Sequence, residues 1–229
     1  MSLAVSSKYT INCLSCKPLE SAARRMVLNS DTCAGSLRTD QHGSRGWLGR
    51  AVYFVKGHLS SEQALEISKD RRRCEVMHFM ACERLFKDTN GEQKCRGNYA
   101  EAGNKNMDEA GKPTPDHLYH HPHTHVIPRY LKEVEWRGKK FKDHTFYDAM
   151  ELNPTPSEKE KKLNAEGNVN IALIEDEVYL LKTDIQEVFV RMIFDKQVPE
   201  VFRPKWEEIE NAFPADSVKK LYFKLKSEQ

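Results

Sequence analysis

The sequence predicts an α+β fold, in which a small four-stranded antiparallel sheet has flanking helices and leads into a helical C-terminal part. Three observations support this prediction. Runs of strand-forming or alternating residues lie between residues 51 and 125. Asn90-Gly91, inside this stretch, is typical of a tight hairpin. Apolar residues recur at helical spacing after Thr183.

The sheet is expected to form from four runs: residues 51–55, 74–85, 93–102 and 118–125. The first, AVYFV, has the composition of a strand. In the second, Val76, His78, Met80 and Cys82 would share one side. The Asn-Gly turn would then place Cys82 and Cys95 on adjacent antiparallel strands.

Helices are expected over residues 18–28 and 61–70, and further helices at Thr183, Pro204 and Asp216. Thr183-x-x-Gln186 matches a capping box, which marks a helix start. Residues 171–181 are interpreted as one strand or a strand pair.

Composition divides the chain into four segments: 1–45 with a possible Cys/His cluster, 46–128 with the sheet, 129–164 as a basic, charged helical tail or linker, and 165–229 as a packing or interaction module. The boundary before the last segment is expected between residues 152 and 170, where Pro and Asn are frequent. The C-terminal helices are a candidate surface for a protein partner.

The overall composition is that of a folded protein of ordinary polarity, with 229 residues, 39% hydrophobic and 31% charged. The net charge of +2 provides no global attraction for nucleic acid or membrane, so any basic signal must be local. No run is apolar enough to span a membrane and no secretory leader is visible, so we expect a reducing compartment, nuclear or cytoplasmic.

Cysteines and histidines are concentrated around the predicted sheet. Cys82 and Cys95 have twelve residues between them, and five of the nine histidines fall within residues 117–125. Thiolate and imidazole are the ligands that zinc prefers, and four of them close a structural site. In a strand, residues i and i+2 lie on the same side, so His123 and His125 could hold one metal. The sequence therefore predicts a Zn²⁺ site formed by Cys82, Cys95, His123 and His125.

Other ligand sets remain open. His121 could replace His125 in a pair with His123, and Cys74 could replace Cys82. A second site could form from Cys13, Cys16, Cys33 and His42. Unligated, buried cysteines and a histidine-rich surface loop would also fit the pattern.

A local basic signal follows Pro128. Residues 129–142 contain six lysines and arginines, interleaved with Tyr130, Trp136 and Phe141. Such a segment can bind a phosphate backbone and stack on bases, although an amphipathic segment with a solvated basic face has the same composition.

The run Cys82…Lys94-Cys95-Arg96-Gly97…His123-Thr124-His125 resembles a FLYWCH-type zinc finger, related to the WRKY and GCM domains. The resemblance covers roughly residues 50–128 and implies a zinc-clamped four-stranded sheet that binds DNA. It implies that basic residues near the sheet contact nucleic acid: Arg71, Arg72, Arg73, Arg84, Lys94 and Arg96. Arginine can read guanine, whereas lysine more often contacts phosphate, and whether the target is DNA or RNA stays open.

Two other functions are considered. The segment 46–54, GWLGRAVYF, resembles the G-x-x-G-x-x-Y-F segment of PARP-like ADP-ribosyltransferases, with Glu177-Val178-Tyr179 as a late strand. That resemblance implies NAD binding, with Tyr53 stacked on nicotinamide. A non-catalytic structural or interaction protein, of a viral type for example, is the third alternative.

Overall fold

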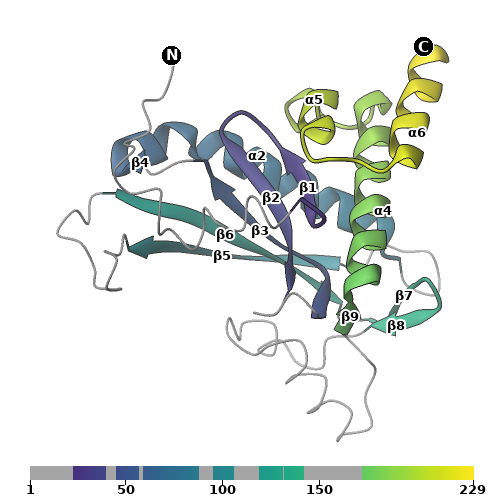
Figure 1. Ribbon diagram of the computed structural model, residues 1–229, viewed down its shortest axis with the longest axis horizontal. Helices are drawn as coiled ribbons and strands as arrows, with labels where there is room; N and C mark the ends of the chain where they lie inside the picture. Colours follow the sequence, from purple (N-terminus) through teal and green to yellow (C-terminus); the bar gives the residue numbers. More distant parts are fainter. Residues whose placement is uncertain are drawn as a thin grey trace, which may run out of the picture.

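The computed structural model describes residues 23–39, 45–56, 59–87, 95–105, 119–130, 132–141 and 172–229. Within these residues the chain forms a large antiparallel sheet, a short hairpin and helices packed against the sheet (Figure 1). The prediction of a mixed α and β fold with an antiparallel sheet is confirmed.

The sheet is larger than the four strands expected. Its members are β1 (Met26–Asn29), β2 (Cys33–Thr39), β3 (Arg45–Val55), β4 (Leu59–Ser60), β5 (Cys95–Lys105), β6 (Tyr119–Tyr130) and β9 (Ala172–Ile174). The described strands follow the order β1-β2-β3-β6-β4, with β5 also paired to β6 and β9 to β3. The predicted strands at 51–55, 93–102 and 118–125 therefore correspond to parts of β3, β5 and β6.

The described helices are α2 (Ser61–Leu85), α4 (Glu175–Phe194), α5 (Trp206–Glu210) and α6 (Asp216–Ser227), with a short 3₁₀ turn η1 (Glu200–Phe202). The helices expected near Pro204 and at Asp216 are confirmed as α5 and α6. In Figure 1, α2 runs behind the sheet, and α4 begins at β9 and runs past β1, with α5 and α6 beside it.

Residues 74–85 are not a strand, contrary to the prediction, because the helix that begins at Ser61 continues to Leu85. Apart from Glu75, the buried residues of this stretch are Cys74, Met77, His78, Ala81 and Cys82. Their spacing is i, i+3, i+4, i+7 and i+8, which places all of them on one helix face. Cys82 and Cys95 are consequently not on adjacent strands; Asn90-Gly91 lies outside the described residues, between a helix and a strand.

Two other predicted elements are also corrected. The end of the expected helix at 18–28 forms β1, and its first residues lie outside the described part of the chain. The expected strand at 171–181 ends at Ile174, and α4 begins at Glu175 rather than at Thr183. Glu175, Asp176 and Glu177 occupy the first turn of α4, where their negative charges stabilise the helix dipole. The linker expected between 152 and 170 lies in residues that are not described.

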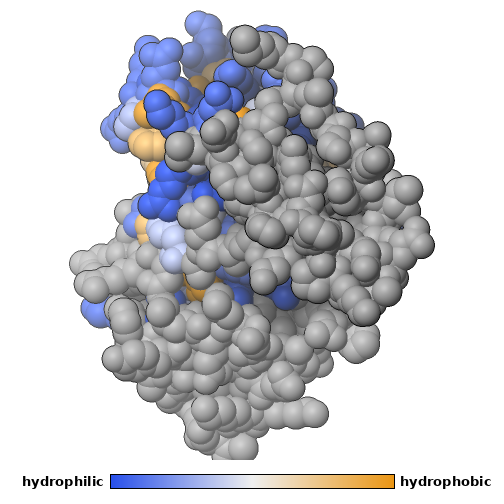
Figure 2. Space-filling view, turned by 90° about the vertical axis from the view of Figure 1, so that its left-hand side faces the viewer, coloured by the Kyte–Doolittle hydropathy of each residue, from blue (hydrophilic) through white to orange (hydrophobic). Residues whose placement is uncertain are grey.

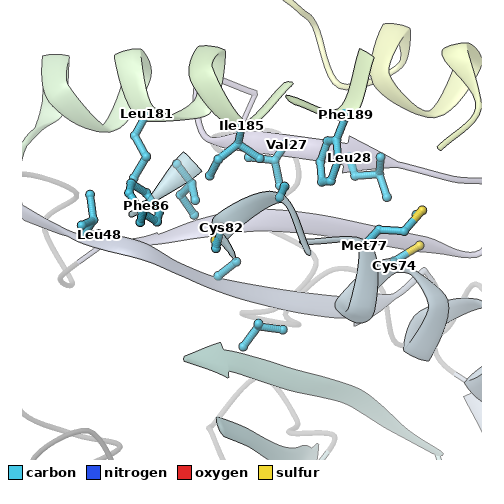
Figure 3. Close-up of a cluster of buried hydrophobic side chains, with 14 of the residues drawn as sticks. Val27, Leu28, Leu48, Cys74, Met77, Cys82, Phe86, Leu181, Ile185 and Phe189 are labelled. Carbon is cyan, nitrogen blue, oxygen red and sulfur yellow. The ribbon is translucent and has the colours of Figure 1, made fainter. Parts of the chain in front are cut away.

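The core lies where α4 and α2 meet the sheet. Figure 3 shows Leu181, Ile185 and Phe189 of α4 pointing toward Val27 and Leu28 of β1, with side chains of α2 on the other side. The core cluster runs from Val27 to Val218 and includes Val134, Trp136 and Phe141, so residues from all four predicted segments pack together.

Gly35 shows how closely the first strands approach. A Cβ atom at this position would lie 2.2 Å from the ring of Tyr53 on the neighbouring strand, so only glycine fits there.

The basic segment after Pro128 is folded rather than a free tail. It contains the end of β6 and a hairpin of β7 (Val134–Trp136) and β8 (Lys139–Phe141). Arg137 binds both carboxylate oxygens of Asp184 on α4, at 3.0 and 2.8 Å, and the indole of Trp136 donates to the same carboxylate at 2.9 Å. The hairpin is thus attached to α4.

Seen from one side, the described surface is mostly hydrophilic, with small hydrophobic areas between charged side chains (Figure 2). No helix in the described ranges is long and apolar enough to cross a membrane.

Candidate functional site

The two histidines predicted as metal ligands lie on β6, which pairs with β3. His125 is opposite Val52 of β3, and His123 is opposite Phe54. Between them, Thr124 is opposite Tyr53, whose ring contacts the ring of His78 on α2 with centroids 5.5 Å apart. Opposite residues of an antiparallel pair share a face, and neighbours in a strand alternate between faces. His123 and His125 therefore lie on the face of the sheet that is turned away from α2.

These two histidines form a pair. Their ring centroids are 5.3 Å apart with an angle of 70° between the rings, and both side chains are half-buried. Desolvation, followed by the charges of Arg50, His123 and Arg38, lowers the pKa of His125 to about 4. The Nδ1 atom of His125 is buried without a hydrogen-bond partner. His125 is therefore a neutral imidazole at pH 7.

Arginines supply the positive charge on this face. Arg50 lies on β3, two residues from Val52, and only 4% of it is exposed. Burial lowers the pKa of Arg50 to about 10, and the charge of Arg38 contributes to the shift, so Arg50 still carries its charge at neutral pH. Arg38 is an exposed residue of β2. We call His123, His125, Arg38 and Arg50 the His/Arg face.

The His/Arg face combines two imidazoles, of which that of His125 is neutral, with fixed positive charge. Guanidinium groups bind carboxylate and phosphate oxygens with two parallel hydrogen bonds. A neutral imidazole beside them can accept a proton or attack an electrophile. The arrangement therefore suits an oxyanion ligand, and phosphate in particular.

Cys82, the first predicted zinc ligand, lies on α2 and is fully buried. Its sulfur is 3.9 Å from the carbonyl oxygen of Gly49, in the layer between α2 and the sheet. The sheet therefore separates Cys82 from His123 and His125. Cys95 begins β5, but its side chain is not among those described. Within the described residues, no group of three or more potential ligands is placed to hold a metal.

The alternative ligands are placed as follows. Cys74, like Cys82, lies in the buried face of α2. Cys33 on β2 is hydrogen-bonded to Cys74, and burial, followed by that hydrogen bond, raises the pKa of the Cys33 thiol. Of the possible second site, Cys13, Cys16 and His42 lie outside the described residues, and so does the side chain of His121.

The arginine triplet predicted to contact nucleic acid makes contacts within the protein. Arg71 lies 3.2 Å from a carboxylate oxygen of Glu75, one helical turn away. Arg73 binds both carboxylate oxygens of Glu208 on α5, at 2.6 and 3.0 Å. Arg72 lies 3.1 Å from Glu75, with its guanidinium 4.1 Å from the ring centroid of Tyr99.

Of the remaining residues predicted to contact nucleic acid, only Arg84 has a described side chain. Arg84 pairs with Asp195 at 2.8 Å. Lys94 lies outside the described residues, and Arg96 is part of β5 with a side chain that is not described. The carboxylates that these described arginines contact belong to α2, α5 and the end of α4.

The residues of the ADP-ribosyltransferase resemblance do not form the expected arrangement. Tyr53 is completely buried between the sheet and α2, so its ring faces the core. Glu177 belongs to the first turn of α4 rather than to a strand, and its carboxylate accepts a hydrogen bond from the backbone N–H of Ile174 at 2.9 Å.

Sequence reasoning missed Arg38 and Arg50. Arg50 offered a signal, because it precedes the strand-like run AVYFV and shares the face of Val52 and Phe54, where a charged residue is unexpected. Arg38 could be recognised only after the pairing of β2 with β3 was known, since 85 residues separate it from His123 in the sequence.

No family model matches this chain, and no curated protein matches it by sequence. Two solved structures resemble it in part. A mutant uridylyltransferase has 15% identity and a TM-score of 0.40, with 77% of this chain and 48% of that chain covered. A second uridylyltransferase structure has 16% identity and a TM-score of 0.41, with 77% and 46% covered. The chain thus spans about half the length of the structures it matches.

Proposed function

We propose that the His/Arg face binds a phosphate ester or phosphoanhydride and that His123 attacks its phosphorus atom. The observation that carries the proposal is the pair of contacting imidazoles, His123 and His125, beside the buried positive charge of Arg50. Phosphoryl transfer depends mainly on positioning and on stabilising negative charge, and these residues supply both.

The charges on this face favour an anion over a cation. The charges of Arg50 and Arg38 both lower the pKa of His125, which means that each disfavours a positive charge on this imidazole. A metal cation bound at the histidine pair would meet the same repulsion from Arg50 and Arg38. A phosphate group would instead be attracted by both guanidinium groups and could accept hydrogen bonds from them.

We assign the attack to His123 rather than to His125. A group with a pKa of about 4, as His125 has, is only weakly basic, and nucleophilic strength falls with basicity. His125 is suited instead to orient its neighbour or to hydrogen-bond a phosphate oxygen through Nε2. This assignment makes His123 the catalytic residue and His125 a positioning residue.

The proposed reaction has two steps. A ring nitrogen of neutral His123 forms an N–P bond while the P–O bond to the leaving group breaks, and the leaving group departs with the bonding electron pair. Water, or an acceptor hydroxyl, then attacks the same phosphorus, the N–P bond breaks, and the attacking oxygen releases its proton to solvent. The imidazole is restored, and no oxidant or reductant is required.

The experiment traps the covalent intermediate. The protein is incubated with nucleoside mono-, di- and triphosphates and a nucleoside diphosphate sugar, each labelled with ³²P, and quenched in alkali. We expect a labelled protein whose bond survives alkali and breaks in acid, as a phosphoramidate does, with the matching increase in intact mass. His123→Ala should remove the label, and added imidazole should restore part of the turnover.

A matched variant separates the roles of the two histidines. His125→Gln retains a hydrogen-bonding side chain, so it should slow turnover without abolishing the labelled protein. Absence of label and of turnover with every compound in the parent protein, or equal labelling of His123→Ala, would contradict the proposal. Thermal unfolding of each variant shows whether the fold is retained.

Zinc binding and DNA binding, which the sequence predicts, stay separate predictions, as does a nuclear or cytoplasmic location. A zinc ion at His123 and His125 would need partners other than Cys82, which faces the opposite side of the sheet. Nucleic-acid binding through Arg71, Arg72 and Arg73 would have to compete with the carboxylates that these arginines already contact.

A further inference from the structure

The solvent-facing side of α6 carries an aromatic ring among lysines. Phe223 is 59% exposed and lies about 140–160° around the helix axis from Val218 and Leu225, which face the core. Four exposed lysines lie within about 100° of Phe223 around the same axis: Lys219, Lys220, Lys224 and Lys226. We call Phe223 and these lysines the Lys/Phe face.

Neighbouring aromatic side chains hold the ring of Phe223 in place. The ring of Tyr222 lies beside it in T-shaped geometry, with centroids 5.4 Å apart, and the ring of Trp206 on α5 lies at 6.2 Å. Trp206 and Tyr222 are themselves stacked, with centroids 4.0 Å apart and 7° between their planes. Phe223 therefore projects from a packed aromatic cluster, and ordering it on binding costs little entropy.

The Lys/Phe face is positively charged. Asp216, at the start of the helix, lies on the same side of α6, and its carboxylate is 3.8 Å from the ammonium group of Lys219. Within the described part of the chain, Lys220, Lys224 and Lys226 form no ion pair. Four lysines less one aspartate leave three positive charges around the exposed ring.

A polyanion that carries flat apolar groups fits this arrangement. Lysine contacts phosphate as a point charge, and nucleobases stack on aromatic rings. The lysines extend over about 10 Å of helix, about the length of three nucleotides at the spacing of one strand. Phe223 projects from a convex helix surface, so a ligand must offer it either a flat face or a pocket. A base supplies the flat face directly, whereas an acidic protein would need a pocket that encloses the ring.

We propose that the Lys/Phe face binds single-stranded nucleic acid, with a base stacked on Phe223 and phosphates beside the lysines. DNA and RNA share these groups, so both should bind. In a duplex the bases stack on one another, and only the phosphate contacts remain. Glu207 and Glu210 on α5 are exposed and repel phosphate, so the strand follows α6 and does not continue onto α5. The inference is independent of the proposed function, because the His/Arg face takes no part in it.

Fluorescence anisotropy with a labelled dT decamer tests the two kinds of contact separately. Phe223→Ala should weaken binding at least about fivefold, as loss of one stacked base does, and should leave the salt dependence unchanged. Phe223→Leu keeps apolar bulk without a flat ring and should weaken binding similarly. Replacing Lys220 and Lys224 by alanine should reduce the slope of log affinity against log salt by about 1.4, or about 0.7 for each phosphate contact.

Phe213→Ala is the matched control. Phe213 is 63% exposed, precedes α6 and has no lysine within four positions along the chain. Its replacement should change neither the affinity nor the salt slope. Thermal unfolding of each variant shows that the fold is retained.

Four results would overturn the inference: no binding of the decamer to the parent protein at low salt, equal effects of Phe223→Ala and Phe213→Ala, equal affinity for a duplex of the same length, or tighter binding of a labelled glutamate decamer, which would assign the face to an acidic protein. His123→Ala should bind the dT decamer as the parent protein does. Failure of the phosphoryl-transfer experiment would therefore leave this inference standing, whereas loss of decamer binding in His123→Ala would refute it.

Discussion

Arg73→Ala is expected to destabilise the fold, because this residue joins α2 to the C-terminal helices. Its guanidinium binds both carboxylate oxygens of Glu208 and donates to the carbonyl oxygens of Val201 and Arg203 at 3.0 and 2.8 Å. The side chain of Arg73 is 15% exposed and that of Glu208 is 8% exposed. The substitution would therefore remove the cation from a buried carboxylate, which would keep only the backbone N–H of Lys205 as a donor, and would leave two backbone acceptors without the guanidinium.

Removing one partner of a buried ion pair costs about 3–5 kcal/mol, most of it from the charge that remains. Arg73 keeps some contact with solvent, so we expect a loss near the lower end, about 3 kcal/mol. For a chain of this size, that corresponds to a decrease in Tm of about 6–12 °C. Arg73→Lys keeps the charge but not the two-pronged geometry, and its loss should be intermediate.

The assay is urea unfolding followed by circular dichroism, with Arg72→Ala as the matched control. Arg72 is the next residue along the same helix, but its side chain is 56% exposed, so its replacement should cost no more than about 1 kcal/mol. A double-mutant cycle with Glu208→Ala should show that the double variant loses less than the sum of the single variants. Equal losses for Arg72→Ala and Arg73→Ala, or additive losses in the cycle, would refute this reasoning.

Nucleic-acid binding by the triplet should accordingly be tested with Arg72→Ala, which is expected to keep the fold.

Two further predictions concern buried groups. His78 donates from Nε2 to the carbonyl oxygen of Gly49 at 2.7 Å, while its buried Nδ1 has no partner, and burial lowers its pKa to about 4. The unfolded chain takes up this proton near its ordinary pKa of about 6.5 and the folded chain does not, so stability should fall by about 3 kcal/mol as pH decreases from 6.5 to 4. His78→Gln should make urea unfolding less pH-dependent over this range, with His125 supplying the remaining dependence; an unchanged slope would contradict the assignment. Cys82→Ser should leave the zinc content of protein purified without chelator equal to that of the parent, because Cys82 and the two histidines face opposite sides of the sheet; loss of a stoichiometric zinc in this variant alone would show that the site includes Cys82.

The zinc prediction shows that the spacing of potential ligands in a sequence does not determine whether their side chains meet in the fold. Cysteine and histidine spacing predicts which residue types could share a metal, but it says nothing about the layer in which each side chain lies. Cys82 could belong to a strand only if residues 74–85 alternated between two faces. The same residues also fit the helical spacing, and long-range contacts of α2 with β3 and β6 favoured the helix. Because residues 74–85 form a helix, Cys82 lies on the opposite side of the sheet from His123.

The sequence by itself determined the local features of the site. Alternation along residues 121–125 placed His123 and His125 on one side of a strand, and strand-forming residues identified the core of β3. The helices at α5 and α6 were also predictable, because their apolar spacing and start signals are local.

Only the tertiary structure decided what surrounds the histidine pair. Arg38 and Arg50 lie on the consecutive strands β2 and β3, whereas His125 lies on β6, which is distant from them in the sequence, and the antiparallel pairing of the three strands brings these residues onto one face. A shift of one residue in that register would turn a strand's side chains to the opposite face. The charge beside His123 therefore depends on non-local strand pairing, which sequence periodicity cannot specify.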